Sequence, residues 1–158
     1  MQVFVSDLEH ARTVAIDNGV THIVSLLDPG HDVDHGLNAE HFVMQFEDAM
    51  DAETSGAPTV KQVQIVLDWV RANTNSQSRL LVHCHGGVSR STAMAVAILI
   101  QSGSSVENAI AEIRRQRPVF CPNNLISEFA DRILGMDGQL HAACEREANR
   151  HILSILSE

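Results

Sequence analysis

Hydrophobic positions along the chain follow two spacings, and each spacing predicts a different kind of element. Short β-branched and apolar runs predict strands, and they cover residues 3–5, 20–27, 41–46 and 80–82. Apolar residues three or four apart predict helices, and these cover residues 6–18, 59–72, 90–101, 104–117, 124–134 and 140–156. Strands that alternate with helices predict an α/β fold, in which helices flank a central, mainly parallel sheet.

Local signals set the expected boundaries of these elements. Ser6 with Glu9, and Ser104 with Glu107, have the three-residue spacing of a capping box and predict two helix starts. Asn123 is expected to cap the helix that follows it. The polar stretches 30–40 and 48–58 are expected to be loops, the first of them after a turn at residues 28–30.

Composition narrows the picture to one domain. A chain of 158 residues with 44% hydrophobic content suits a single domain spanning 1–158 around one core. The formal net charge of −9 argues against nucleic-acid and anionic-membrane partners. The longest apolar run, residues 93–100, is too short for a membrane span. The N-terminal residues lack the pattern of a signal peptide, and three widely spaced cysteines suggest a reducing cytoplasm.

The segment after the strand at 80–82 carries the candidate chemistry. It reads His-Cys-His-Gly-Gly-Val-Ser-Arg-Ser over residues 83–91, so a buried strand is expected to break into a glycine-bearing loop that enters a helix. Such a loop directs successive backbone N–H groups and the positive end of a helix dipole at one point. The sequence therefore predicts an anion-binding nest formed by His85, Gly86, Gly87, Val88, Ser89 and Arg90.

Two side chains make this nest suitable for phosphoryl transfer. Cys84 stands at its start, where the N–H groups and the dipole favour the nucleophilic thiolate. Arg90 returns to the nest in the first helical turn, and its planar fork can grip two phosphate oxygens. A nucleophile, an oxyanion cradle and a bidentate clamp thus lie within seven residues.

At this point the sequence resembles a known family. His83-Cys84, Gly87 and Arg90-Ser91 match the His-Cys-x-x-Gly-x-x-Arg-Ser/Thr signature of protein tyrosine phosphatases. Residues 81–93 resemble the dual-specificity branch, including its compact bacterial members. The Arg-Pro…Pro-Asn stretch at 117–123 is similar to one that this branch often has near the site, so the resemblance covers about residues 20–134.

The resemblance implies a cysteine-phosphatase fold of the dual-specificity type and a role for each matching residue. Cys84 would attack phosphorus and form a phosphocysteine, while Arg90 binds the phosphate. His83 would orient the loop and help to hold the thiolate, and the Ser91 hydroxyl would assist breakdown of the intermediate. No cofactor and no metal are implied.

The resemblance also implies a general acid on a separate loop, some thirty residues before the cysteine. Asp48 follows the strand at 41–46 directly, and Asp51 is its rival. By bare count Asp51 fits better. Asp48 is preferred because loops absorb insertions and strand ends do not.

Other polar residues receive plainer interpretations. His31, Asp32, Asp34, His35 and His41 could suggest a metal site, but their spacing sets no closed tetrahedral geometry, and a solvated loop explains them better.

The two cysteines outside the loop are interpreted as packing residues. Cys121 and Cys144 lie far along the chain from Cys84. A disulfide between Cys84 and Cys121 under oxidation is the alternative interpretation.

The expected function is hydrolysis of phosphate monoesters, on phosphotyrosine and on phosphoserine or phosphothreonine of proteins or on a small phosphoester. Phe46 and Phe120 are the aromatic residues expected near the mouth, which predicts a shallow, permissive pocket. Alternatives on the same fold are a phosphoinositide or RNA 5′-phosphatase and a non-catalytic phospho-binding pseudophosphatase. An arsenate reductase or rhodanese-like sulfur carrier can share the Cys-x5-Arg loop, but the late position of the loop favours the phosphatase.

Overall fold

The computed structural model describes all of residues 1–158, and its regular elements alternate as the sequence predicts. In chain order they are β1 (Gln2–Ser6), α1 (Ala11–Asp17), β2 (His22–Leu27), β3 (Glu40–Gln45), α2 (Val60–Asn73), β4 (Arg79–His83), α3 (Arg90–Gln101), α4 (Val106–Gln116), α5 (Asn124–Leu134) and α6 (Gln139–Leu156). No helix is both long enough and apolar enough to cross a membrane.

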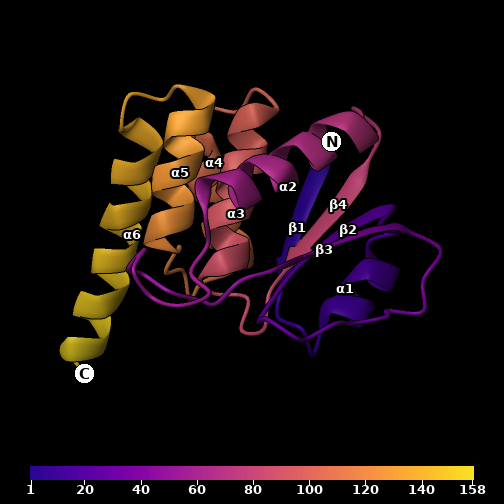
Figure 1. Ribbon diagram of the computed structural model, residues 1–158, viewed down its shortest axis with the longest axis horizontal. Coiled ribbons are helices and arrows are strands. Elements are labelled where there is room, and N and C mark those ends of the chain that lie inside the picture. Colours follow the sequence, from indigo (N-terminus) through magenta and orange to yellow (C-terminus); the bar gives the residue numbers. More distant parts are fainter.

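The four strands form one sheet in the order β1-β4-β2-β3, and every pairing in it is parallel (Figure 1). The expectation of a central parallel sheet is therefore confirmed. Val82 of β4 stands opposite Val5 of β1 and Val24 of β2. Because all strands run the same way, the segments that follow β2, β3 and β4 leave the sheet at the same edge.

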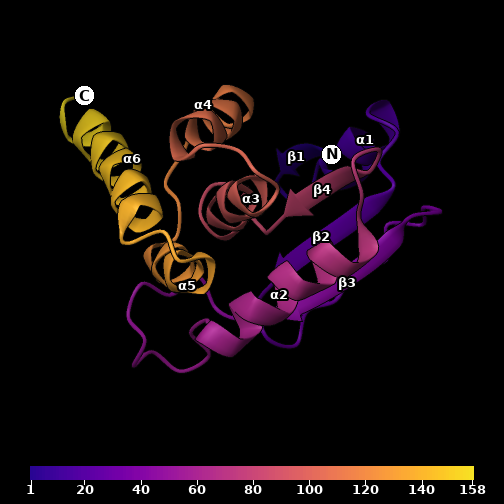
Figure 2. The ribbon, with the colours of Figure 1, turned by 90° about the horizontal axis from the view of Figure 1, so that it is seen from above.

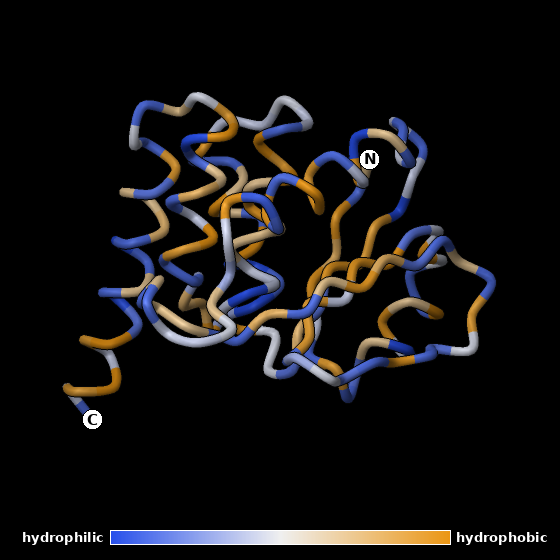
Figure 3. Tube along the Cα trace, in the orientation of Figure 1, coloured by the Kyte–Doolittle hydropathy of each residue, from blue (hydrophilic) through white to orange (hydrophobic).

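The helices cover the two faces of the sheet unequally (Figure 2). Helices α2 to α6 and one face of the sheet share a core cluster of 31 buried residues. On the other face α1 is the only helix. Its Ala11 and Ala15 pack against Ile23 of β2 and Leu81 of β4 in a cluster of four buried residues. In Figure 3 the apolar positions gather between the sheet and the larger helical layer, where α3 is apolar almost all round and largely buried.

Two of the predicted helix starts are wrong. Ser6 is the last residue of β1 and pairs with His83, so its backbone cannot also begin a helix. Helix α1 starts later, at Ala11, after a turn. In α4 the cap is Ser105, not Ser104, and its hydroxyl accepts the N–H of Asn108 at 3.1 Å.

The other predicted cap is confirmed. The Oδ1 atom of Asn123 accepts the N–H of Ile126 at 3.0 Å, and α5 follows it. This cap brings Asn123 to the edge of the sheet where the candidate loop lies, because the backbone N–H of Asn123 also donates to the carbonyl of Ser89.

Candidate active site

The loop between β4 and α3 wraps around the sulfur of Cys84. The cysteine side chain is buried, with 2% of its surface exposed. The backbone N–H of Gly87 donates to Sγ at 3.2 Å, and the hydroxyl of Ser91 lies 3.1 Å from the same atom. The sulfur is therefore held by groups that stabilise a thiolate.

The remaining N–H groups of the loop have no partner within the chain. No backbone hydrogen bond is donated by five residues of the loop and the first helical turn, namely His85, Gly86, Val88, Ser89 and Arg90. They belong to the loop that follows Cys84 and to the N-terminus of the buried helix α3, whose dipole adds positive potential. This arrangement can bind a tetrahedral oxyanion.

The carbonyl groups of the loop are bound from outside by other segments. The guanidinium of Arg117 donates from Nε to the carbonyl of Gly87 at 2.9 Å and from Nη2 to that of Gly86 at 3.1 Å. The N–H of Leu8 donates to the carbonyl of His85 at 3.1 Å. These bonds fix the loop with its carbonyls turned toward Arg117 and Leu8.

The two adjacent glycines have different roles. Gly87 has φ +66°, and a Cβ atom there would lie 2.6–2.8 Å from backbone atoms of Ser6 and Asp7. At Gly86 φ is not in the left-handed region, and a Cβ atom would meet nothing within 4 Å. Only Gly87 therefore requires glycine.

Arg90 presents one edge of its guanidinium toward the loop. Its side chain is buried, and Nη1 donates to the Asp28 carboxylate at 2.6 Å and to the carbonyl of Phe46 at 2.8 Å. The buried Nε has no partner. Burial raises the pKa of Asp28, but the hydrogen bond and charge of Arg90 outweigh it and hold that pKa below its ordinary value. The sequence did not predict Asp28 as a partner of Arg90, although it follows a strand end at the same edge.

The two candidate acids lie in different surroundings. Asp48 lines the same pocket as Cys84, and its Oδ1 accepts hydrogen bonds from Ser89 Oγ at 2.7 Å and Asn123 Nδ2 at 2.9 Å. The Asp51 carboxylate instead accepts the N–H of Glu53 at 3.0 Å, in the exposed loop beyond. Asn123, predicted only as a helix cap, thus also orients Asp48.

Behind the loop lies a group of imidazoles centred on His83, in which His83 and His35 are buried and His41 is exposed. The Nδ1 atom of His83 is 3.2 Å from the carbonyl oxygen of Cys84. Its Nε2 atom lies 2.6 Å from Ser25 Oγ and 3.0 Å from His35 Nε2, and Ser25 Oγ lies 2.7 Å from His41 Nε2. If Nδ1 of His83 carries the proton and donates to the carbonyl of Cys84, Nε2 offers one lone pair, which can accept from Ser25 or from His35.

This surrounding keeps His83 neutral. Burial is the largest cause that lowers the pKa of His83, to about 4, and the hydrogen bond to Cys84 opposes it only in part. Burial likewise lowers the pKa of His35 and that of His41. The interpretation of His35 as part of a solvated loop is therefore wrong, because only 7% of its surface is exposed.

A second group of polar residues could hold a metal ion. Ligand atoms of Asp28, His31 and His85 lie within 4.8 Å of one another. The sequence did not predict that His85 would meet His31. In this arrangement the Nε2 atom of His85 already accepts the N–H of Asp28 at 3.1 Å, and the Asp28 carboxylate pairs with Arg90. A metal ion would therefore compete with both contacts.

The pocket above Cys84 has a volume of about 360 Å³. Its lining consists of Asp48, Met50, Cys84, Gly86, Val88, Ser89, Arg90, Cys121 and His151. Phe46 and Phe120 are absent from this lining and are 1% and 3% exposed, so the expectation that they flank the mouth is wrong. Both side chains belong to the apolar core.

Two of the lining residues were not expected there. Cys121 is a free thiol, and burial is the main reason that its pKa is raised, with Asp48 adding to the effect. His151 comes from α6, and no signal in the sequence links this helix to the loop. Cys144 is buried within the core, as expected.

Comparison with known proteins agrees with this geometry. Residues 4–131 match the family described as "Dual specificity phosphatase, catalytic domain". The human "Dual specificity protein phosphatase 13B" is 28% identical over 149 residues, covering 87% of this chain and 70% of that protein. The Xenopus laevis "Dual specificity protein phosphatase 1-A" is 28% identical over 92 residues, covering 57% of this chain. Those residues span only 24% of the Xenopus protein.

Solved structures share the fold. The crystal structure of human DUSP28 superposes with a TM-score of 0.66 at 19% identity, and the match covers 85% of this chain and 94% of that one. The structure of Tk-PTP in its active form gives a TM-score of 0.58 at 25% identity, over 85% and 92% of the two chains. The expected cysteine-phosphatase fold is therefore confirmed.

Proposed function

The chain belongs to the dual specificity phosphatase family, and from that premise we propose that it hydrolyses phosphate monoesters through a phosphocysteine intermediate. The proposed substrates are phosphotyrosine and, more slowly, phosphoserine or phosphothreonine of proteins. Cys84 is the nucleophile, Arg90 the phosphate clamp and Asp48 the general acid and base.

The observation that carries this proposal is the unpartnered edge of Arg90. A buried guanidinium nitrogen without a partner is costly unless a ligand completes it. Because Nη1 is bound to Asp28 and Phe46, Nε and Nη2 form a free fork. This fork and the five unpaired N–H groups of the loop match the oxygens of a phosphoryl group bound above Cys84.

In the first step the Cys84 thiolate attacks phosphorus, an S–P bond forms and the bond to the leaving oxygen breaks. Asp48 protonates that oxygen. Its Oδ1 already accepts two hydrogen bonds, from Ser89 and Asn123, which leaves Oδ2 to carry the proton. Arg90 and the loop N–H groups stabilise the charge on the equatorial oxygens.

In the second step water attacks the phosphocysteine and releases inorganic phosphate. Asp48, now ionised, accepts a proton from the water, while the S–P bond breaks and its electron pair returns to sulfur. The Ser91 hydroxyl, 3.1 Å from Sγ, donates a hydrogen bond to the departing thiolate. His83 holds the carbonyl of Cys84 by a neutral contact, since its low pKa leaves it uncharged at pH 7.

The net charge of −9 supports phosphopeptides with basic residues beside the phosphate as the preferred partners. Three free cysteines support action in a reducing cytoplasm. Added salt should weaken the preference for basic flanks, because such surface attraction is screened.

The test is turnover of a generic aryl phosphate beside phosphotyrosine, phosphoserine and phosphoinositide panels. Cys84→Ser should reduce turnover by more than about 10⁴-fold, as loss of a nucleophile does in other enzymes. It should still bind inorganic phosphate, because the loop N–H groups and Arg90 remain. Undiminished hydrolysis by Cys84→Ser would overturn the cysteine mechanism.

Two further outcomes of the same panels would redirect the proposal. Faster turnover of phosphoinositides than of any phosphopeptide would favour the lipid alternative, and phosphate binding without turnover would favour a pseudophosphatase. Activity should also survive a chelator, since no step uses a metal. Loss of activity in the chelator, restored by a divalent ion, would assign a role to Asp28, His31 and His85.

A further inference from the structure

The upper wall of the catalytic pocket is built by segments distant from the loop. Cys84 and Arg90 lie at the floor and are nearly buried, whereas Met50 on the wall is half exposed. Met50 belongs to the loop between β3 and α2, and His151, which lines the same pocket, belongs to α6. A group attached to a phosphate bound at the floor must pass between such wall residues.

The helix that supplies His151 lies outside the part of the chain that matches the family. That match ends at residue 131, and α6 begins at Gln139. Figure 1 shows α6 at the edge of the helical layer, with its C-terminal end extending toward the side of the molecule where the loop emerges. The position of His151 therefore does not follow from the family signature.

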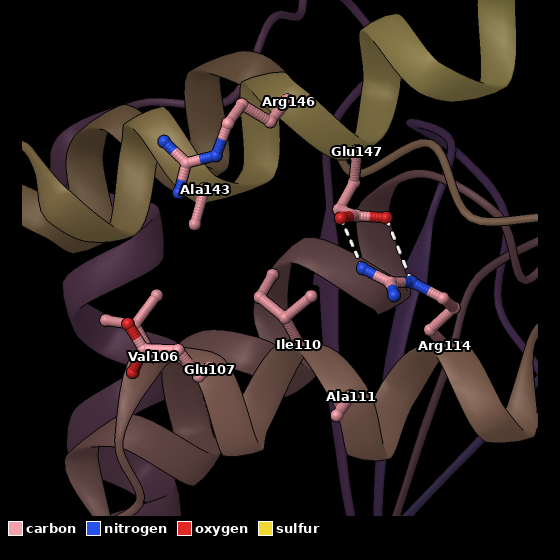
Figure 4. Close-up of a pocket in the computed structure, with 8 residues that line it drawn as sticks. All are labelled: Val106, Glu107, Ile110, Ala111, Arg114, Ala143, Arg146 and Glu147. Atoms are coloured by element: carbon pink, nitrogen blue, oxygen red, sulfur yellow. Dashed lines mark hydrogen bonds and ion pairs between the residues drawn. The ribbon is translucent and has the colours of Figure 1, made fainter.

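Helix α6 is firmly attached one turn before His151. Glu147, with 7% of its surface exposed, forms a two-bonded ion pair with Arg114 of α4 (Figure 4). At the start of the helix the Asp131 carboxylate accepts the N–H groups of Gly138 at 2.8 Å and His141 at 3.0 Å. Because residues four apart lie on one helix face, these contacts hold the turn that presents His151 to the pocket.

His151 also carries the only ring that lines the pocket. The chain contains no tyrosine, and no phenylalanine or tryptophan is among the lining residues. The imidazole of His151 makes no hydrogen bond within the chain, and the nearby hydroxyl of Ser154 donates instead to the backbone carbonyl of this residue. Its ring is thus available to a ligand.

On the basis of the proposed function, we infer that His151 contacts the organic group of the substrate and sets a preference for aryl over alkyl phosphates. The flat imidazole can pack against the phenyl ring of a phosphotyrosine. The thioether of Met50 offers a sulfur–aromatic contact from the other part of the wall. An alkyl phosphate such as phosphoserine has no ring to gain from either contact.

Binding of two non-hydrolysable probes tests this directly. Phenylphosphonate and methylphosphonate share the anionic head and differ in the ring, so the ratio of their dissociation constants isolates the wall. His151→Ala should reduce the preference for phenylphosphonate by about 2- to 10-fold, the range expected for an aromatic contact. His151→Phe should retain the preference, and Leu153→Ala, a 65% exposed position on the same helix end, is the matched control.

Turnover gives a second readout. His151→Ala should raise KM for an aryl phosphate and leave kcat within about twofold, because a ground-state contact is lost while Asp48 and Cys84 are unchanged. An unchanged ratio of dissociation constants in His151→Ala, or an equal change in Leu153→Ala, would overturn the inference. If the protein binds both phosphonates but turns over no substrate, the proposed hydrolysis fails while the binding ratio still decides the role of His151.

Discussion

The floor and the wall of the pocket are built in different ways. The floor comes from one contiguous stretch, residues 83–91, in which Cys84 and Arg90 are buried and the loop carbonyls are bonded from outside, while five N–H groups remain free for a ligand. The wall combines Asp48, Met50 and His151, which come from two segments distant from the loop along the chain and face solvent to different degrees. The comparison indicates that the proposed nucleophile and the anion-binding groups are local in sequence, whereas tertiary structure brings in the proposed general acid and the residues inferred to contact the leaving group.

The largest expected effect tests whether the wall takes part in the chemistry. Asp48→Asn should lower turnover by about 10²- to 10⁴-fold, because the leaving oxygen is no longer protonated. The loss should shrink for aryl phosphates with good leaving groups. Asp51→Asn is the matched control and should stay near wild type, since Asp51 only caps the local turn at Glu53. The assignment is wrong if the two variants exchange these behaviours.

The next prediction concerns the imidazoles behind the floor. The pKa of His83 is lowered from 6.5 to about 4 in the folded protein, so between these pH values the unfolded chain binds more protons. Stability should therefore be fully present above pH 6.5 and fall as the pH drops toward 4, by up to about 3 kcal/mol from this residue. The lowered pKa values of His35 and His41 act in the same direction.

Urea unfolding at several pH values between 7 and 4 measures this dependence. His83→Asn should flatten the fall in unfolding free energy, whereas Leu153→Ala, a non-titrating change at a 65% exposed position, should leave it as in wild type. Identical pH dependence in wild type and His83→Asn would show that the cluster is not responsible.

The two adjacent glycines of the floor should differ in how much stability is lost when each is replaced by alanine. Gly87→Ala should cost about 1–3 kcal/mol of stability, because its Cβ would strike the backbone of Ser6 and Asp7 at a positive φ. Gly86→Ala should cost less than about 0.5 kcal/mol, as expected for a substitution without a clash. Thermal unfolding of both variants provides the comparison, and equal losses would contradict this account of the loop.

The smallest expected effect lies where floor and wall meet. Asn123 donates from Nδ2 to Asp48 at 2.9 Å and caps α5 with Oδ1. Asn123→Ser keeps an oxygen that can cap α5 but removes the amide group that donates to Asp48. Turnover should therefore fall by less than about tenfold, the worth of one hydrogen bond, and the free energy of unfolding should change little. Asn123→Ala should lose both. Equal activity in wild type and Asn123→Ser would show that Asp48 does not depend on this contact.

The sequence predicted well whatever depends on neighbouring residues. The predicted ranges 90–101 and 124–134 match α3 and α5, and periodicity and caps also predicted the order of strands and helices. The loop from Cys84 to Arg90 was found because its donors, glycine and arginine are adjacent in the chain. Asp48 was preferred to Asp51 because it directly follows a strand, where insertions are rarer than in loops. The catalytic role of Asp48 remains a prediction.

The features that escaped prediction all depend on distant segments. Whether Ser6 caps a helix is decided by its pairing with β4. The buried state of His35 depends on its contact with His83, 48 residues later. Likewise, the place of His151 depends on how α6 packs against α4. The periodicity of hydrophobic residues does not specify which distant residue a given side chain will contact in the folded protein.

The pairing of β1 with β4 also bears on the order in which the protein can form. Gln2 stands opposite Arg79, and β1 has no other neighbour in the sheet. Strands β2 and β3 can pair as soon as residue 45 has left the ribosome, but β1 must wait until β4 has been made. Gly87 packs on the end of β1, so the sulfur cannot acquire its surroundings before that strand docks. The two ends of this pairing, residues 2–6 and 79–83, must therefore both be in place before Cys84 acquires the surroundings that its proposed role requires.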